Sequence, residues 1–159
     1  MAQDTRGMTD EEIREQVVRL GFGGDRARFE EFCRLLREGL PAGTGVALRG
    51  SVITDARYED GQPFDSKGPG TSDLDVTLIG ADVRECWKQD AYYIPGLHTM
   101  PLYDGDPDCA PNLDRLRREL QRVARRPVSF QATSDIVLFA RDVLFNQPYF
   151  VLIEPDADA

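Results

Sequence analysis

Apolar residues recur at helical spacing in two segments near the start of the chain. Residues 9–20 open with Thr9 and Glu12 in a capping-box pattern, and apolar side chains follow at Ile13, Val17, Val18 and Leu20. A second stripe starts after Asp25, a good N-cap residue, and ends near Gly39; its apolar members are Phe29, Phe32, Leu35 and Leu36. We expect two core-covering helices, with Cys33 as a small buried side chain.

Shorter apolar runs predict strands at residues 46–48, 73–79, 128–131 and 150–153. Three further helices are expected. Residues 81–93 would carry an aromatic face, residues 112–124 would be capped by Asn112, and a last helix would start at Ser134 and Asp135. With 159 residues, the pattern predicts a single α/β or α+β domain, with residues 1–40 as helical support and residues 154–159 as an acidic tail.

Two connecting segments show neither the helical nor the strand periodicity of apolar residues. Residues 55–71 are polar and rich in glycine, proline and aspartate, which predicts a long loop that we call the flap. Its large apolar residues, Tyr58 and Phe64, would pin it to the body or form a substrate lid. Residues 95–111 form the second irregular stretch and contain His98, the single histidine, which we expect at the surface rather than as a catalytic base.

The cysteines, the first residues and the length of the apolar runs indicate the cellular compartment. Cys33, Cys86 and Cys109 show no CxxC spacing, which argues against zinc and against a disulfide framework. The first residues lack the pattern of a signal peptide, and no apolar run approaches the ~20 residues of a membrane helix. We therefore expect a cytoplasmic protein with no membrane partner.

The net charge of -9 argues against indiscriminate binding to nucleic acid. One basic run stands out, with Glu119 as the opposing acid within it: Arg115, Arg117, Arg118, Arg122, Arg125 and Arg126. This run is either a solvated helix face or a surface for phosphate or RNA.

The candidate chemistry lies between residues 46 and 80. Gly50 and Ser51 follow an apolar strand, where a glycine lets a ligand approach the backbone and a serine offers hydroxyl and amide to phosphate. Asp73 and Asp75 alternate with apolar residues, so a strand would place both carboxylates on one face, about 7 Å apart. A hard divalent cation, magnesium or manganese, would offset the cost of burying such a pair.

These motifs resemble the nucleotidyltransferase superfamily typified by DNA polymerase beta. The match is carried by Gly50, Ser51, Ser72, Asp73, Leu74 and Asp75. The resemblance implies an α+β fold with a small mixed β-sheet flanked by helices. It also implies nucleotide binding by Gly50, Ser51 and Ser72, and a catalytic metal site at Asp73 and Asp75.

The chain departs from that family in two ways. Residues 52–72 separate the motifs by 21 positions, where the family uses about a dozen. A third carboxylate is expected on a later strand, yet the aligned strand offers Ser129, and the nearest downstream acid is Asp135. Both remain candidates for the third position, although Ser129 cannot act as a base at neutral pH.

Three functions are open at this point. The chain could transfer a nucleoside monophosphate from a nucleoside triphosphate to a hydroxyl of RNA, protein or a small molecule. It could be a degenerate binding module, for example in a bacterial toxin–antitoxin or effector system, because the third carboxylate is missing. It could also be a structural domain with a solvated Asp-x-Asp.

Overall fold

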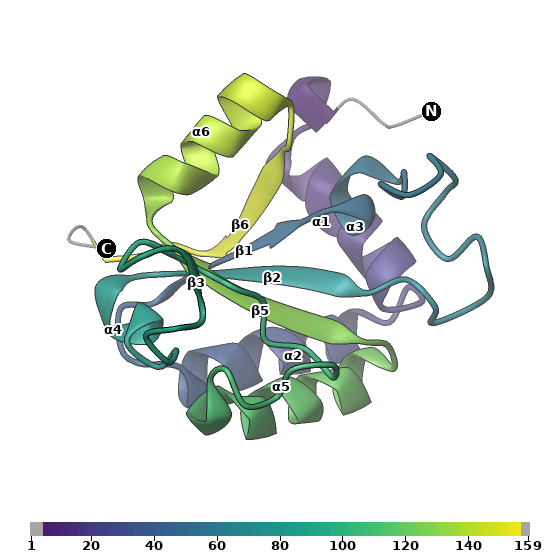
Figure 1. Ribbon diagram of the computed structural model, residues 1–159. Coiled ribbons are helices and arrows are strands. Elements are labelled where there is room, and N and C mark those ends of the chain that lie inside the picture. Colours follow the sequence, from purple (N-terminus) through teal and green to yellow (C-terminus); the bar gives the residue numbers. More distant parts are fainter. Residues whose placement is uncertain (1–4, 157–159) are drawn as a thin grey trace.

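The computed structural model describes residues 5–156 as a six-stranded mixed sheet with helices on both faces (Figure 1). The first four residues, and residues 157–159 of the predicted acidic tail, lie outside that range. After a 3-10 turn at Thr5–Gly7, the helices are α1 (Asp10–Gly21), α2 (Arg26–Gly39), α3 (Ser51–Thr54), α4 (Ala81–Arg84), α5 (Pro111–Ala124) and α6 (Asp135–Phe145). The strands are β1 (Gly45–Arg49), β2 (Leu74–Ile79), β3 (Tyr92–Ile94), β4 (His98–Thr99), β5 (Val128–Thr133) and β6 (Tyr149–Ile153). The predicted α+β class and mixed sheet are confirmed.

The strands lie in the order β3-β4-β5-β2-β1-β6. The central pair, β2 and β5, is parallel, whereas β1 runs antiparallel to β2 and to β6. This register places Arg49, Asp75 and Ser129 side by side on three neighbouring strands. Because side chains alternate between faces, all three point to the same side of the sheet.

The opposite side of the sheet carries the main core. Leu48, Leu74, Val76 and Phe130 point into it and are at most 1% exposed. The apolar stripes of α1, α2 and α5 complete this core, and Figure 1 shows α2 and α5 together beneath the sheet. The predicted capping box of the first helix is present, because Glu12 N donates to Thr9 Oγ1 and Thr9 N to Glu12 Oε2. Cys33 is buried, as predicted.

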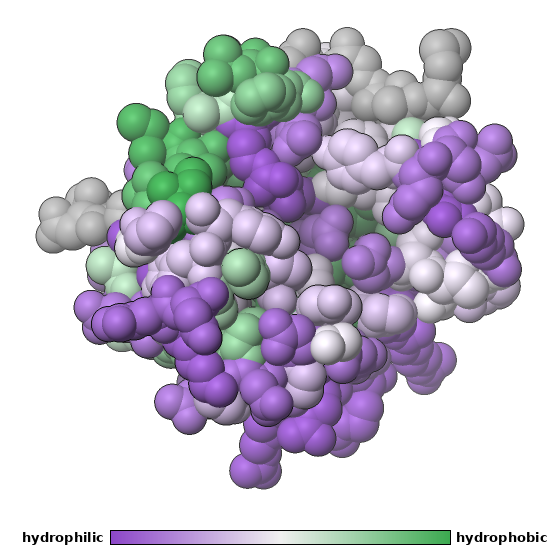
Figure 2. All heavy atoms as spheres, in the orientation of Figure 1, coloured by the Kyte–Doolittle hydropathy of each residue, from purple (hydrophilic) through white to green (hydrophobic). Residues whose placement is uncertain are grey.

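Helix α6 lies on the face that carries Asp75. It is anchored by Leu138, which packs against Ala47 and Ile79 in a small second cluster. The outer side of α6 exposes a run of large apolar residues: Ile136, Phe139, Val143, Leu144 and Phe145. Figure 2 shows these hydrophobic atoms gathered over α6, bordered by hydrophilic atoms in the middle of the same face.

Two predicted helices differ from the structure. The helix expected over residues 81–93 ends at Arg84, and Tyr92 joins a strand instead. The indole of Trp87 donates to Met100 O at 2.9 Å, which ties the turn to the following segment, and β3 gains ladder hydrogen bonds that an exposed helix end would lack. Asn112 lies inside α5 rather than capping it, because Pro111 takes the first helical position.

None of the helices within residues 5–156 combines the length and apolar character that crossing a membrane requires.

Candidate functional site

The Gly-Ser turn lies where β1 meets α3. Gly50 adopts a φ of 80°, in the left-handed region that glycine tolerates best. A Cβ atom at this position would overlap the Oδ2 atom of Asp75. The glycine therefore allows the turn and the second aspartate to touch, although they are 25 positions apart in the chain.

The two aspartates differ in their surroundings. Asp73 is exposed just before β2, whereas Asp75 is half-buried on the strand and accepts a hydrogen bond from Ser129 Oγ at 3.0 Å. Burial, followed by the charge of Asp73, raises the pKa of Asp75 to about 6, against the smaller opposing effects of Arg49 and Ser129. Asp75 is thus an acid whose ionised form lacks full compensation from the protein.

A bound cation would supply the missing compensation. Within residues 5–156, no cluster of three or more His, Cys, Asp or Glu residues has the geometry of a metal site. Two carboxylates nevertheless suit magnesium, which usually takes one or two protein carboxylates and completes its shell with water and phosphate. The contact between Gly50 and Asp75 also leaves this corner free of a Cβ atom.

The structure separates Ser129 and Asp135, the two candidates for the third ligand position beside the aspartates. Ser129 lies directly beside Asp75 in the parallel ladder and bonds to it. Asp135 begins α6 beyond the far end of β5. Four residues of strand after Ser129 already span about 13 Å, so Asp135 lies away from the aspartate pair. Ser129 is the residue that the fold brings to Asp75.

A cavity of about 420 Å³ opens between the aspartates and the flap, and we call it the flap pocket. Its lining consists of the following residues: Ser51, Arg57, Tyr58, Glu59, Lys67, Thr71, Ser72, Asp73 and Asp75. Asp73 and Asp75 thus face the flap cations Arg57 and Lys67, and the flap also brings Glu59, which lies 3.5 Å from Arg57. This combination suits a phosphate ester that carries a divalent cation.

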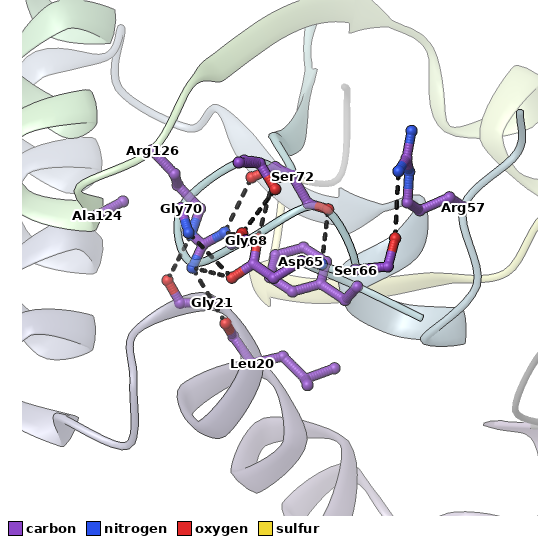
Figure 3. Close-up of polar contacts among 12 residues, drawn as sticks. Leu20, Gly21, Arg57, Asp65, Ser66, Gly68, Gly70, Ser72, Ala124 and Arg126 are labelled. Atoms are coloured by element: carbon purple, nitrogen blue, oxygen red, sulfur yellow. Dashed lines mark hydrogen bonds and ion pairs between the residues drawn. The ribbon is translucent and has the colours of Figure 1, made fainter. Parts of the chain in front are cut away.

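Arg126, two residues before β5, helps to hold the flap in place (Figure 3). Arg126 donates to both oxygens of Asp65, at 2.8 and 3.0 Å, and to the Ser72 carbonyl at 2.9 Å. It also donates to the carbonyls of Leu20 and Gly21 at the end of α1. Arg126 therefore joins three segments that are remote in sequence.

Asp65 completes this anchor. Its carboxylate accepts from the backbone amides of Ser72 at 2.9 Å and Gly70 at 3.2 Å. Burial alone would raise the pKa of Asp65, but the bonds from Arg126, Ser72 and Gly70 lower it below its ordinary value. Asp65 is consequently ionised over the physiological pH range.

The two apolar flap residues play different parts. Phe64 is buried beneath Arg126, whose guanidinium lies 4.7 Å from the ring centroid, so Phe64 pins the flap. Tyr58 is 67% exposed and lines the flap pocket. The hydroxyl of Ser72 accepts from Asp65 N at 2.8 Å, so this predicted nucleotide ligand lines the pocket while its oxygen is engaged in the anchor.

A second cavity of about 420 Å³ lies on the same sheet face, next to α6, and we call it the sheet pocket. It shares Tyr58 and Asp75 with the flap pocket. The remaining lining residues are Arg49, Val76, Thr77, Tyr93, Pro101, Ser129, Gln131, Arg141 and Gln147. Asp75 is thus the one carboxylate, among the described residues, that lines both cavities.

His98 was expected at the surface, but it is buried on β4, with 8% of its area exposed. Its Nδ1 lies 3.0 Å from Thr133 Oγ1, and its Nε2 faces the donors Gln131 Nε2 and Arg141 Nη1. Desolvation, then the charges of Arg141 and Arg49, lower the pKa of His98 to about 4. The imidazole is therefore neutral and accepts hydrogen bonds through Nε2.

The arginines of the basic run, on α5 and just after it, divide into buried and solvent-facing residues. Arg117 is 1% exposed and pairs with Asp104 and Asp114, and Arg126 belongs to the flap anchor. The other four arginines are exposed: Arg115, Arg118, Arg122 and Arg125. Helix α5 covers the face opposite the two pockets, so this surface is separated from the aspartates by the sheet.

Sequence reasoning missed several cavity residues. Arg57 and Lys67 were grouped with the flap and given no role, although basic residues inside an otherwise acidic loop are a usable signal. Gln131 alternates with apolar neighbours on β5, which marks the same face as Ser129. Arg141 carried no sequence signal, because only the placement of α6 brings it over the sheet.

The chain matches no family model, no curated protein and no solved structure.

Proposed function

We propose that this chain is a metal-dependent nucleotidyltransferase with a nucleotidyltransferase-like fold. It would transfer a nucleoside monophosphate from a nucleoside triphosphate to a hydroxyl acceptor and release pyrophosphate. The carrying observation is the direct contact between the Gly50 turn and Asp75, which together with Ser51 lines the flap pocket. This contact joins a phosphate-binding turn to a carboxylate pair in a cavity of suitable size.

Each residue has a part in that reaction. Ser51, Arg57 and Lys67 line the side of the cavity where phosphate oxygens would lie, and cations there offset charge on a triphosphate. Asp73 and Asp75 would hold magnesium or manganese, which when bound neutralises the phosphates and aligns them.

The bond changes are those of a single displacement. The acceptor oxygen bonds to the α-phosphorus, and the bond from that phosphorus to the pyrophosphate oxygen breaks. The hydroxyl proton leaves to a carboxylate, and Asp75 is the carboxylate that faces both cavities. Gly50 and Ser129 position Asp75 from either side.

The test is incorporation of labelled nucleotide by the purified chain with magnesium. Asp73→Ala combined with Asp75→Ala should reduce incorporation to background, while Arg122→Gln on the opposite face serves as the matched control. Wild-type incorporation in the double variant would exclude the proposal.

A second candidate is a nucleotide-binding module that performs no transfer, for instance within a toxin–antitoxin or effector system. The observation in its favour is Ser129, a hydroxyl where a third carboxylate would bridge two metal ions. Magnesium and nucleotide would then raise the melting temperature together without turnover. Measured turnover rejects this candidate, and a melting temperature that responds to neither ligand rejects both.

A further inference from the structure

The sheet pocket contains two half-buried arginines that form no ion pair within the described chain. Arg49, at the end of β1, donates through Nε to Thr77 Oγ1 at 3.1 Å. Arg141, on α6, donates through Nε to Gln147 Oε1 at 3.0 Å and through Nη1 to His98 Nε2 at 3.4 Å. Each guanidinium therefore keeps donors that no carboxylate of residues 5–156 engages.

The most deeply buried arginine side chains have carboxylate partners, and half-buried Arg28 and Arg84, outside the two pockets, donate to backbone carbonyls instead. Arg117 meets Asp114 at 2.7 Å and Asp104 at 2.9 Å, and Arg126 meets Asp65 at 2.8 Å. Removing a cation from water is costly unless an anion accompanies it, and these two sites follow that rule. Arg49 and Arg141 depart from it inside a cavity.

The surroundings compensate the charge of the two arginines only in part. Burial, followed by the charge of Arg49, lowers the pKa of Arg141, against smaller opposing effects of Tyr58 and Asp75. His98 is a neutral hydrogen-bond acceptor and supplies no negative charge. The side-chain amide of Gln131 donates to the Thr99 carbonyl at 2.7 Å. Asp75 is the acidic side chain that lines the pocket, against two arginines.

We propose that Arg49 and Arg141 form a subsite for an anionic group, a carboxylate or a phosphate, on a small acceptor molecule. The acceptor role rests on the proposed function. Guanidinium groups bind both anions through paired N–H donors. A cavity of about 420 Å³ admits a small molecule, and its positive charge disfavours a polycationic one.

The position of the subsite separates it from the donor nucleotide. Ser51, Arg57 and Lys67 line the flap pocket and not the sheet pocket, and Asp75 lies between the two cavities. With the triphosphate at Ser51, a molecule held by Arg49 and Arg141 lies across Asp75 from it. Its hydroxyl then faces the carboxylate that would receive the proton.

Titration calorimetry with succinate and with inorganic phosphate tests the subsite. We expect at least one probe to bind wild type, with binding at least ten-fold weaker in Arg49→Gln and in Arg141→Gln. Arg141→Lys, which keeps the charge, should retain part of the affinity, and Arg122→Gln should match wild type. No binding of either probe to wild type, or equal binding by folded Arg49→Gln and Arg141→Gln, overturns the subsite.

A second measurement assigns the subsite to acceptor or nucleotide. The dissociation constant of a non-hydrolysable magnesium-nucleotide should change less than three-fold in Arg141→Gln and at least ten-fold in Asp73→Asn. A ten-fold loss in Arg141→Gln would assign the arginines to the triphosphate and overturn the acceptor role. Anion binding without any nucleotide binding by wild type supports the anion subsite while excluding the proposed transferase.

Discussion

Asp75 holds the central position among individual residues because it contacts the Gly50 turn, bonds to Ser129 and lines both cavities. Its raised pKa has a thermodynamic consequence. A carboxyl with a pKa of about 6 in the folded state and about 4 in the unfolded chain destabilises the fold as pH rises from 4 through 6. The site therefore carries a stability cost that an uncharged amide would avoid.

Asp75→Asn should consequently stabilise the protein near neutral pH. At pH 4 we expect a small difference from wild type, growing to about 2 to 3 kcal/mol at pH 7, since each pKa unit corresponds to about 1.4 kcal/mol. Urea unfolding at both pH values measures this difference. A variant that is less stable than wild type at pH 7 would contradict the account of Asp75.

His98 affects the pH dependence of stability in the opposite direction to Asp75. Its pKa of about 4 lies below the ordinary value of 6.5, so its stabilising contribution is complete above pH 6.5 and disappears as pH falls through 4. Because the chain has one histidine, its imidazole proton signal can be assigned directly in an NMR titration. We expect a midpoint near pH 4, and a midpoint at 6 or above would show that the ring is solvated.

At the scale of elements, the flap is ordered by its anchor rather than by secondary structure. No helix or strand lies between Thr54 and Leu74. The bidentate pair of Arg126 and Asp65, the amides of Ser72 and Gly70, and buried Phe64 supply the order instead. The position of Tyr58 over the pockets depends on that support.

Arg126→Met should release the flap. It leaves Asp65 half-buried without its cation, and breaking such a pair costs about 3 to 5 kcal/mol. Hydrogen exchange should accelerate most at the amides of Ser72 and Gly70, with urea unfolding as the measure of overall stability. Arg122→Gln is the matched control, because Arg122 is exposed on the same helix-to-strand region. Unchanged exchange in the flap would contradict the anchoring role.

Helix α6 offers a contrast between its two sides. Leu138 is 2% exposed and holds the helix to the sheet, so Leu138→Ala should cost about 2 to 4 kcal/mol. Leu144 is 71% exposed, and Leu144→Ala should change stability by less than about 0.5 kcal/mol. Chemical unfolding of the two variants measures the difference. A large effect at Leu144 would mean that this face is covered in solution.

Over the whole molecule, local signals predicted much of the fold. The Thr9 capping box and the strand that follows Asp73 each depend on a few neighbouring residues, and both are present. The resemblance in motif order implied one site for the Gly50 turn and the two aspartates, but the direct contact between Gly50 and Asp75 came from the structure. The strand after Pro127 indeed brings Ser129 beside Asp75.

Contacts between remote segments were beyond sequence reasoning. His98 was expected at the surface because a two-residue strand leaves almost no periodic signal. Arg126 was grouped with a solvated or nucleic-acid surface because its partners lie 54 to 106 positions away. The presence of Arg49 and Arg141 in one pocket likewise depends on how α6 crosses the sheet. Each of these features belongs to tertiary packing.

The long sequence separation of the Arg126 contacts also determines the order in which parts of the site can form during synthesis. The Gly50 turn and the aspartates are complete once residue 75 has been made, but the flap lacks its anchor until residue 126 follows. Strand β5, which supplies Ser129 beside Asp75, emerges at the same stage. Contacts of such long sequence separation form late because the entropy cost of closing the intervening loop comes before the contact can stabilise the chain. A nascent chain therefore carries both motifs well before it carries a pocket.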